Sequence, residues 1–291
     1  MPRVVAFVSA KGGVGKTTLC ANFAAQAVGR VHPERVLGVD LDPSGDLAWD
    51  LGYRGEPPDD EGAALANALL RGATPPPAPI GLCGLDVLAG GPRLRFATNV
   101  KASLASDAVG ALAELLRSLS SGYGLVVVDC PPGLGAMTRL ALAAADGVVI
   151  PTHADDASLA AIGALAPVWR DIRAHHNARL ALLGVVLTQV PSKLRRLEVQ
   201  LRDDLRTIGG SHLRVFRTVV RANLEAACGA RRLGLTADEY AHGAAQHADG
   251  TDSDARIRAA RALADDYRHL TGEILNRLHS HRASTAEGAR P

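Results

Sequence analysis

The feature that most constrains this chain is a glycine-rich loop between an apolar run and a helical run. Residues 4–9 are apolar and rich in valine, which is the pattern of a short buried strand. The next residues are Ala10-Lys11-Gly12-Gly13-Val14-Gly15-Lys16-Thr17-Thr18, and a helix is expected from about Lys16 to Val28. Glycines allow a sharp turn that aims backbone N–H groups at an anion, and a helix N-terminus favours negative charge. The arrangement predicts a phosphate-binding P-loop.

The two lysines of this loop support that interpretation. Only four of the 32 basic residues are lysine, and two of these four are Lys11 and Lys16. A compact ammonium group suits a phosphate, so we expect Lys16 to contact the β- and γ-phosphates and the Thr17 hydroxyl to hold Mg²⁺. The alternative is a glycine turn with surface lysines. The predicted ATP-binding residues here are Lys11, Gly12, Gly13, Val14, Gly15, Lys16, Thr17 and Thr18.

Apolar strands alternate with helical stretches along the chain. Strands are expected at 35–40, 85–89, 125–129, 147–151 and 180–187, with helices at 103–119, 134–145, 155–174 and 192–207. This order predicts an α/β fold, with a mostly parallel, twisted sheet covered by helices on both faces, the P-loop NTPase architecture. Residues 54–80 carry six prolines and are expected to form a surface excursion. We expect one domain over 1–291, with a polar linker at 243–253 and a C-terminal helix at about 254–278.

Carboxylates follow two of the predicted strands. Asp40 and Asp42 lie two residues apart at the end of one strand, so alternation places them on the same face. They repel each other unless a cation or polar partner is near, and a phosphate-bound Mg²⁺ would be such a partner. Asp129 ends a run of four apolar residues, as in a Walker B strand, and is expected to reach Mg²⁺ through water. The alternatives are a simple strand-end turn for the pair and a helix N-cap for Asp129.

Positive charge is concentrated in one part of the chain. The whole chain has a net charge of +2, whereas residues 189–232 hold ten basic and four acidic residues, a net of +6. Such an asymmetry predicts a polyanion-binding face, and the lone aromatic residue there, Phe216, favours contacts to duplex phosphates over base stacking. The alternative is a solvated, arginine-rich surface. The predicted DNA-contacting residues are Lys193, Arg196, Arg217 and Arg221.

Other classes of protein fit the sequence less well. No apolar run approaches the ~20 residues that a membrane-spanning helix needs. The last helix continues into residues 280–284 (Ser-His-Arg-Ala-Ser), which lack bulky apolar side chains, so no membrane contact is expected either. The four cysteines lie far apart without a CxxC pair, which argues against a zinc ribbon or a disulfide framework. We therefore expect a cytoplasmic protein. The cysteines are Cys20, Cys83, Cys130 and Cys228.

The chain resembles the ParA/MinD group of deviant Walker A ATPases, and most of all the ParA partition ATPases. Residues 11–18 (Lys-Gly-Gly-Val-Gly-Lys-Thr-Thr) match the deviant Walker A motif, and 129–135 (Asp-Cys-Pro-Pro-Gly-Leu-Gly) resemble a second motif of the group. Residues 40–46 resemble a third motif, from which Ser44 and Asp46 depart. Residues 215–220, followed by Asn223, resemble a later strand and loop near the nucleotide base. The similarity spans about residues 3–235 and resumes in the last helix.

This resemblance implies roles for particular residues. Asp42 would orient the attacking water, Asp40 would support the water shell of Mg²⁺, and Asn223 would lie near the base. Lys11 would reach across an ATP-dependent homodimer to the partner subunit's ATP, where it would stabilise charge on the transferred phosphoryl group. The implied catalytic residues are thus Lys11, Lys16 and Asp42.

The resemblance also implies a function. An ATP-bound dimer would bind double-stranded DNA non-specifically, and a ParB-like centromere-binding protein would stimulate hydrolysis and release. Such a protein would be associated with the nucleoid. The leading alternative is a MinD-like positioning ATPase at a membrane or cell pole. An electron-transfer ATPase of the NifH type would need a suitable partner for Cys130, and none is evident in the sequence. A non-hydrolysing ATP binder fits poorly with the presence of Lys11, Asp42 and Asp129.

Overall fold

The structure of the chain is a computed structural model. It describes residues 2–53, 60–72, 78–79, 84–103, 109–119, 122–153, 155–191, 199–200, 202–203, 205, 207, 213–246 and 251–287. Two of the predicted DNA-contacting residues, Lys193 and Arg196, lie outside the described residues, and so does most of the helix expected at 192–207.

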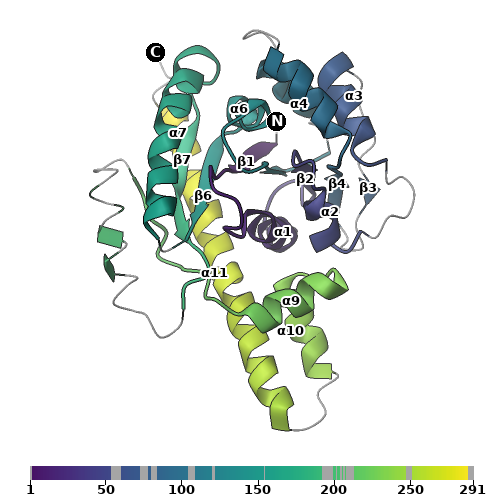
Figure 1. The fold of residues 1–291 in the computed structure, drawn as a ribbon, viewed down its shortest axis with the longest axis vertical. Helices are drawn as coiled ribbons and strands as arrows, with labels where there is room; N and C mark the ends of the chain where they lie inside the picture. Colours follow the sequence, from purple (N-terminus) through teal and green to yellow (C-terminus); the bar gives the residue numbers. More distant parts are fainter. Residues whose placement is uncertain are drawn as a thin grey trace.

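A seven-stranded sheet forms the centre of the molecule, as the sequence predicts (Figure 1). Its order is β3-β4-β2-β5-β1-β6-β7, and all neighbouring pairs are parallel except the short edge strand β3, which is antiparallel to β4. The parallel arrangement brings the carboxyl ends of β1, β2 and β5 together, because Asp129 is in register with both Phe7 and Asp40. The strands are β1 Arg3–Phe7, β2 Val36–Asp40, β3 Ala78–Pro79, β4 Leu85–Leu88, β5 Leu125–Asp129, β6 Gly147–Thr152 and β7 Ala181–Leu187.

Helices cover both faces of the sheet and bury two apolar layers (Figure 1). Alternate residues of β1 enter different layers, Val4 and Ala6 one and Val5 and Phe7 the other, which explains the continuous apolar run of the strand. One layer is covered by α3 Ala63–Arg71, α4 Leu94–Ser103, α5 Ala111–Ser118, α6 Ala136–Ala144 and α7 Asp156–His175. The other is covered by α1 Lys16–Ala27, α2 Asp46–Asp50, α9 Leu224–Leu233, α10 Ala237–Gln246 and α11 Thr251–Glu287.

Several elements differ from the expectation. The predicted surface excursion at 54–80 contains helix α3, which buries Leu65 and Leu69 in the core and is bounded by Gly62 and Gly72 in left-handed conformations. Prolines on either side hide this short amphipathic helix in the sequence. The helix predicted at 103–119 is replaced by α4, which ends at residue 103, and by α5. Helices α10 and α11 both extend into the predicted linker at 243–253, and α11 is longer than the helix expected at 254–278.

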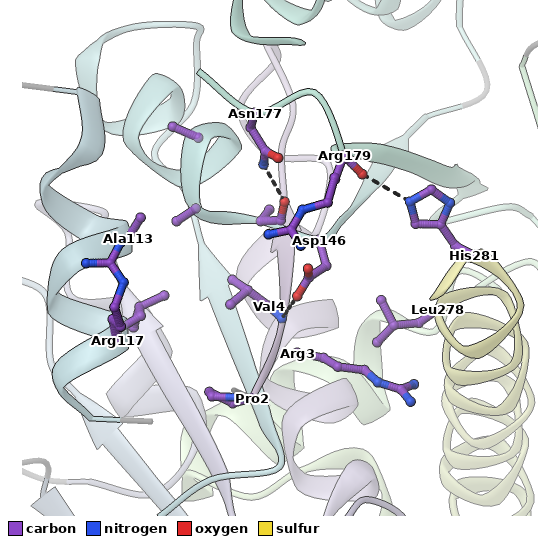
Figure 2. Close-up of a pocket in the computed structure, with 14 residues that line it drawn as sticks. Pro2, Arg3, Val4, Ala113, Arg117, Asp146, Asn177, Arg179, Leu278 and His281 are labelled. Atoms are coloured by element: carbon purple, nitrogen blue, oxygen red, sulfur yellow. Dashed lines mark hydrogen bonds between the residues drawn. The ribbon is translucent and has the colours of Figure 1, made fainter. Parts of the chain in front are cut away.

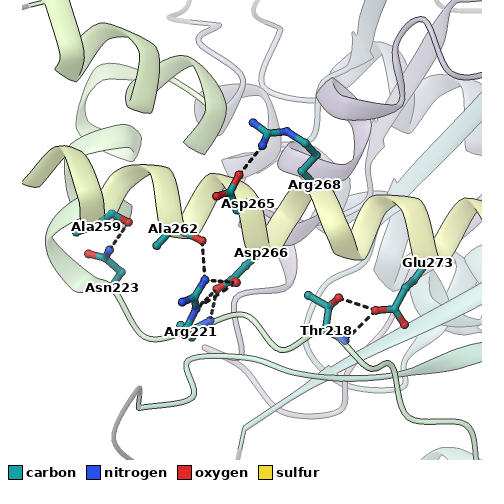
Figure 3. Close-up of polar contacts among 9 residues, drawn as sticks. All are labelled: Thr218, Arg221, Asn223, Ala259, Ala262, Asp265, Asp266, Arg268 and Glu273. Atoms are coloured by element: carbon teal, nitrogen blue, oxygen red, sulfur yellow. Dashed lines mark hydrogen bonds and ion pairs between the residues drawn. The ribbon is translucent and has the colours of Figure 1, made fainter.

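The long helix α11 is fastened to the segment that precedes α9 (Figure 3). The Glu273 carboxylate accepts hydrogen bonds from the backbone N–H groups of Arg217 and Thr218, at 2.9 and 2.8 Å, and from the Thr218 hydroxyl. Burial alone would raise the pKa of Glu273, but these hydrogen bonds, with the nearby charge of Arg277, lower it. Asp266, two turns earlier on the same helix, pairs with Arg221. Carboxylates on α11 thus hold residues 217–221, which are part of the basic segment 189–232, against this helix.

No helix within the described ranges is both long and apolar enough to cross a lipid bilayer.

The Glu273 contacts predict a loss of stability on neutralisation. Glu273→Gln should lower the free energy of unfolding by about 1–3 kcal/mol, because the donors of Arg217 and Thr218 lose a charged acceptor. The pKa of Glu273 is lowered in the folded state, so its contribution is present above the unfolded pKa and is lost as the pH falls through the folded pKa. Urea unfolding of both proteins between neutral pH and pH ~3 measures this difference. Glu114→Gln, on the exposed side of α5, is the matched control, and equal effects of the two changes would contradict the assignment.

Candidate active site

The phosphate loop lies between β1 and α1, where the sequence places it. Gly13 and Gly15 have φ angles of 77° and 75°, a left-handed conformation in which any side chain would be strained. The ends of other strands support the loop from outside. The Thr188 hydroxyl, after β7, donates to the carbonyl of Val14 at 2.8 Å, and the Gln189 amide donates to the carbonyl of Gly13 at 3.2 Å. Contacts within the chain thus shape the loop.

Asp129 lies at the bottom of the site and faces the start of α1. Its Oδ2 accepts a hydrogen bond from the Thr17 hydroxyl at 2.6 Å, and its Oδ1 lies 3.7 Å from Nζ of Lys16. Burial raises the pKa of Asp129 to about 6, against the opposing effects of Lys16 and Thr17. Among the described residues, Oδ1 accepts no hydrogen bond, although the carboxylate is buried. Such a carboxylate oxygen has unused capacity toward a cation.

Asp40 and Asp42 have different environments. Asp40 ends β2 and is fully buried, and its two oxygens accept the backbone N–H groups of Asp42 and Leu47 at 2.9 and 3.1 Å. Burial and the charge of Asp129 raise the pKa of Asp40. Asp42 lies beyond the strand, is partly exposed and accepts the N–H of Ser44. Asp40 thus holds the turn that presents Asp42, an arrangement that the alternation of a strand does not predict.

Gly90 packs directly against this turn and is missed by the sequence analysis. A Cβ atom at Gly90 would lie 2.6 Å from the carbonyl oxygen of Asp42 and 2.7 Å from Cγ of Asp40. These distances are far below any allowed contact, so only glycine fits here. The signal in the sequence was the Gly90-Gly91 pair just after the strand at 85–89, where parallel sheets form their sites.

Lys11 is turned toward its own chain. Its Nζ forms an ion pair with Asp155 at 2.7 Å, at the start of α7, and both side chains are partly exposed. His153 lies beside this pair, 4.0 Å from Asp155. Burial, followed by the charge of Lys11, lowers the pKa of His153, which favours a neutral imidazole. The sequence does not reveal Asp155 as a partner, because the two residues are 144 positions apart.

A polar connection runs from the loop to α9. The Thr18 hydroxyl donates to Asp50 at 3.0 Å, and Arg231 on α9 lies 3.1 Å from the same carboxylate. Arg231 also pairs with Asp46 at 2.8 Å, on the helix that follows the turn at Asp42. Asp50 is buried, so its charge depends on these partners. Arg231 thereby links the phosphate-loop helix, the turn after Asp42 and α9.

Three residues predicted from the later part of the chain lie just before α9. Asn223 is predicted to lie near the nucleotide base, and Arg217 and Arg221 are predicted to contact DNA. Asn223 caps α9 by accepting the N–H of Ala226, and its amide donates to the carbonyl of Ala259. Both ends of this side chain thus have protein partners, and Figure 3 shows the contact with Ala259. Both arginines are exposed, and Arg221 donates to Asp266 and to the carbonyl of Ala262.

Comparisons with known proteins agree with this geometry. The AAA domain family (AAA_31) matches residues 2–182. The chromosome-partitioning ATPase Soj of Thermus thermophilus is 35% identical over 278 residues, which cover 95% of this chain and 96% of that protein. The chromosome partitioning protein ParA of Myxococcus xanthus is 31% identical and covers 76% of each chain.

Solved structures share the fold. Cobyrinic acid a,c-diamide synthase from Mycobacterium smegmatis, with a bound ATP analog and magnesium, superposes with a TM-score of 0.68 at 27% identity, covering 80% of this chain and 93% of that one. The ATP complex of a single-residue variant of McdA from Cyanothece superposes with a TM-score of 0.76 at 18% identity, covering 94% and 96%.

The fold, the loop and these matches define a P-loop ATPase with a deviant Walker A motif. More narrowly, the chain belongs to the ParA/Soj family of chromosome-partitioning ATPases.

The contact of Gly90 with the turn at Asp40–Asp42 predicts an effect on turnover. Gly90→Ala should lower the rate of ATP hydrolysis by about 10- to 100-fold, because the added methyl group displaces Asp42 from its position. The affinity for ADP should change little, since the phosphate loop lies on other strands. Steady-state hydrolysis and a fluorescent-ADP titration measure the two quantities. The control is Gly163→Ala on α7, where an added Cβ meets no atom within 4 Å, and a Gly90 variant as active as this control would contradict the prediction.

Proposed function

We propose that this chain partitions DNA by an ATP-driven cycle of dimerisation, DNA binding and release. The observation that carries the proposal is the intact set of Lys11, Lys16, Thr17, Asp42 and Asp129 around one loop, in a chain that matches Soj over nearly its full length. The chain is an ATPase that uses ATP and Mg²⁺. In the proposed cycle, ATP binding assembles the dimer and hydrolysis takes it apart in the cytoplasm, on the nucleoid.

The residues at the loop fit a magnesium nucleotide. Backbone N–H groups of 12–18 and the ammonium of Lys16 would bind the phosphates, while Thr17 and Asp129 would hold Mg²⁺, whose charge neutralises the phosphates when it is bound. No cluster of three or more His, Cys, Asp or Glu suited to a metal occurs among the described residues. Mg²⁺ at a phosphate site keeps several waters and takes few protein ligands. Asp40 is buried behind the turn, so its proposed contribution is to position Asp42.

Asp42 is the residue proposed to orient the attacking water. It is partly exposed on the turn held by Asp40 and Gly90, close enough to the buried site to raise the pKa of Asp129. A carboxylate there can accept a hydrogen bond from water and aim the lone pair of its oxygen at the terminal phosphate. As the bond from the water oxygen to the terminal phosphorus forms, the bond from that phosphorus to the ADP oxygen breaks and ADP leaves. The water proton stays hydrogen-bonded to Asp42 during this step and ends on the released phosphate.

Lys11 is proposed to act in the partner subunit's site, where it would stabilise charge on the transferred phosphoryl group. Its ion pair with Asp155 is partly exposed, and such pairs contribute only about 0.2–1 kcal/mol. A triphosphate offers far more negative charge than one carboxylate, so exchange of partners upon dimerisation is energetically accessible. Breaking the ion pair between Lys11 and Asp155 costs little free energy, so the pair can form again after hydrolysis.

The DNA-binding face is proposed to lie on the basic segment before α9. Arg217 is exposed there, whereas the guanidinium of Arg221 is hydrogen-bonded to Asp266. Arg217 is therefore the stronger candidate for contact with DNA phosphates. Lys193 and Arg196 remain candidates by sequence. A ParB-like protein is proposed as the partner that stimulates hydrolysis, as the resemblance to the ParA partition ATPases implies.

The proposed role of Lys11 predicts a specific defect. Lys11→Ala should retain ADP binding, because Lys16 and the glycine loop remain, but should lose about 10²-fold or more of the hydrolysis rate. Steady-state hydrolysis and light scattering with ATP and Mg²⁺ measure turnover and dimerisation. Lys101→Ala provides a matched lysine control outside the loop. Unchanged turnover of the Lys11 variant would remove its proposed role.

The DNA proposal is tested by electrophoretic retardation of arbitrary duplex with ATP, ADP or no nucleotide. An Asp42→Ala variant should accumulate as an ATP-bound dimer and retard DNA strongly, and Arg217→Ala in that background should weaken retardation and its salt dependence. The control is Arg71→Ala, at the end of α3. Equal retardation in all three nucleotide states would contradict the proposal. If the ATP-bound protein sediments with liposomes and does not retard DNA, the membrane-positioning alternative is favoured.

A further inference from the structure

A cavity lies at the amino-terminal ends of the strands, at the end of the sheet opposite the phosphate loop (Figure 2). It has a volume of about 300 Å³ and is formed at the amino-terminal ends of β1, β6 and β7, with α5 and the end of α11 completing its wall. The proposed ATP cycle uses the carboxyl ends of the strands and leaves this cavity unassigned.

Three arginines, together with one histidine, dominate the polar lining of the cavity. Arg3, Arg117, Arg179 and His281 come from four different places in the chain, and Figure 2 shows Arg117 on one side of the cavity with Arg3 and His281 on the other. The opposing carboxylate is Asp146, whose Oδ2 already accepts the backbone N–H of Val4 at 2.9 Å. Within the described part of the chain, Arg117 and Arg179 form no ion pair. These two guanidinium groups thus have unused donors.

The wall of the cavity is fixed by contacts between distant parts of the chain. The Asn177 amide donates to the carbonyls of Leu142 and Ala145, at 3.1 and 2.7 Å, and thereby joins the loop before β7 to the end of α6. The imidazole of His281 lies 3.0 Å from the carbonyl of Arg179 and joins α11 to the same loop. A cavity held in this way does not have to be assembled when a ligand arrives, which lowers the cost of binding.

We propose that this cavity binds a small molecule that carries an oxyanion, a phosphate or a carboxylate, on a compact apolar body. Guanidinium groups match both oxyanions with paired N–H donors, and Arg117 and Arg179 are the residues assigned to this contact. Leu116, Ala144 and Leu278 supply apolar wall for the rest of the ligand. The volume is at the lower end of the range for small-molecule sites, and its concave shape does not suit a convex duplex.

The test uses phenyl phosphate as probe and isothermal titration calorimetry as readout, on the full chain with its phosphate loop saturated by ADP and Mg²⁺. Benzoate and benzyl alcohol are titrated in parallel, to separate phosphate from carboxylate and charged from neutral ligands. The variant is Arg117→Gln with Arg179→Gln, and the matched control is Arg71→Gln with Arg95→Gln, two exposed arginines on α3 and α4. Circular dichroism checks that each variant is folded.

We expect phenyl phosphate, benzoate or both to bind the ADP-loaded protein, benzyl alcohol not to bind, and the Arg117/Arg179 variant to weaken binding at least tenfold. ATP hydrolysis should be unchanged in that variant, because neither arginine lies near the phosphate loop. The proposal is overturned if neither anion binds, or if the double variant binds as well as the control variant. It is also overturned if the double variant loses duplex retardation while its affinity for both anions is unchanged, since the arginines would then belong to a DNA surface.

Discussion

The buried carboxylate of Asp129 is the group on which the rest of the site depends. Asp129 is 1% exposed, and a buried charge costs free energy unless it is paired. Its two partners, Lys16 and Thr17, both come from the first turn of α1. Helix α1 must therefore begin beside the end of β5, which requires β1 to lie next to β5 in the sheet. The same burial that raises the pKa of Asp129 leaves one of its oxygens able to contact a cation. The contact of Asp129 with Lys16 and Thr17 thus both places the start of α1 beside β5 and forms the proposed cation site.

A second set of charges connects the site with the region proposed to bind DNA. Arg231 contacts Asp46 and Asp50, so α9 is joined to the turn that presents Asp42 and to the helix that carries Thr18. Carboxylates of α11 hold the segment before α9 on its other side. Helix α9 is therefore joined to the phosphate-loop helix by Arg231, and the segment that precedes α9 is joined to α11.

The sequence predicts contiguous features well and distant pairings poorly. The glycine loop and the parallel sheet are confirmed, because each arises from residues adjacent in the chain. The helix at Ala63–Arg71 was missed, since flanking prolines outweighed its short apolar pattern. Arg221 carries a charge that suits DNA, yet the structure pairs it with Asp266, 45 residues away. No local pattern indicates which of many carboxylates an arginine will meet.

The sequence by itself determined the P-loop, the α/β architecture and the two strand-end carboxylates Asp40 and Asp129. Hydrophobic periodicity and glycine spacing are local properties of the sequence. In a parallel sheet the carboxyl ends of the strands lie at the same end of the sheet, so strand-end residues come together there. Only the tertiary structure decided that Asp40 faces inward to hold a turn, that Gly90 closes against that turn, and that Lys11 pairs with Asp155. Each of these depends on the close approach of separate segments, which is set by the packing of the whole core rather than by any single stretch of chain.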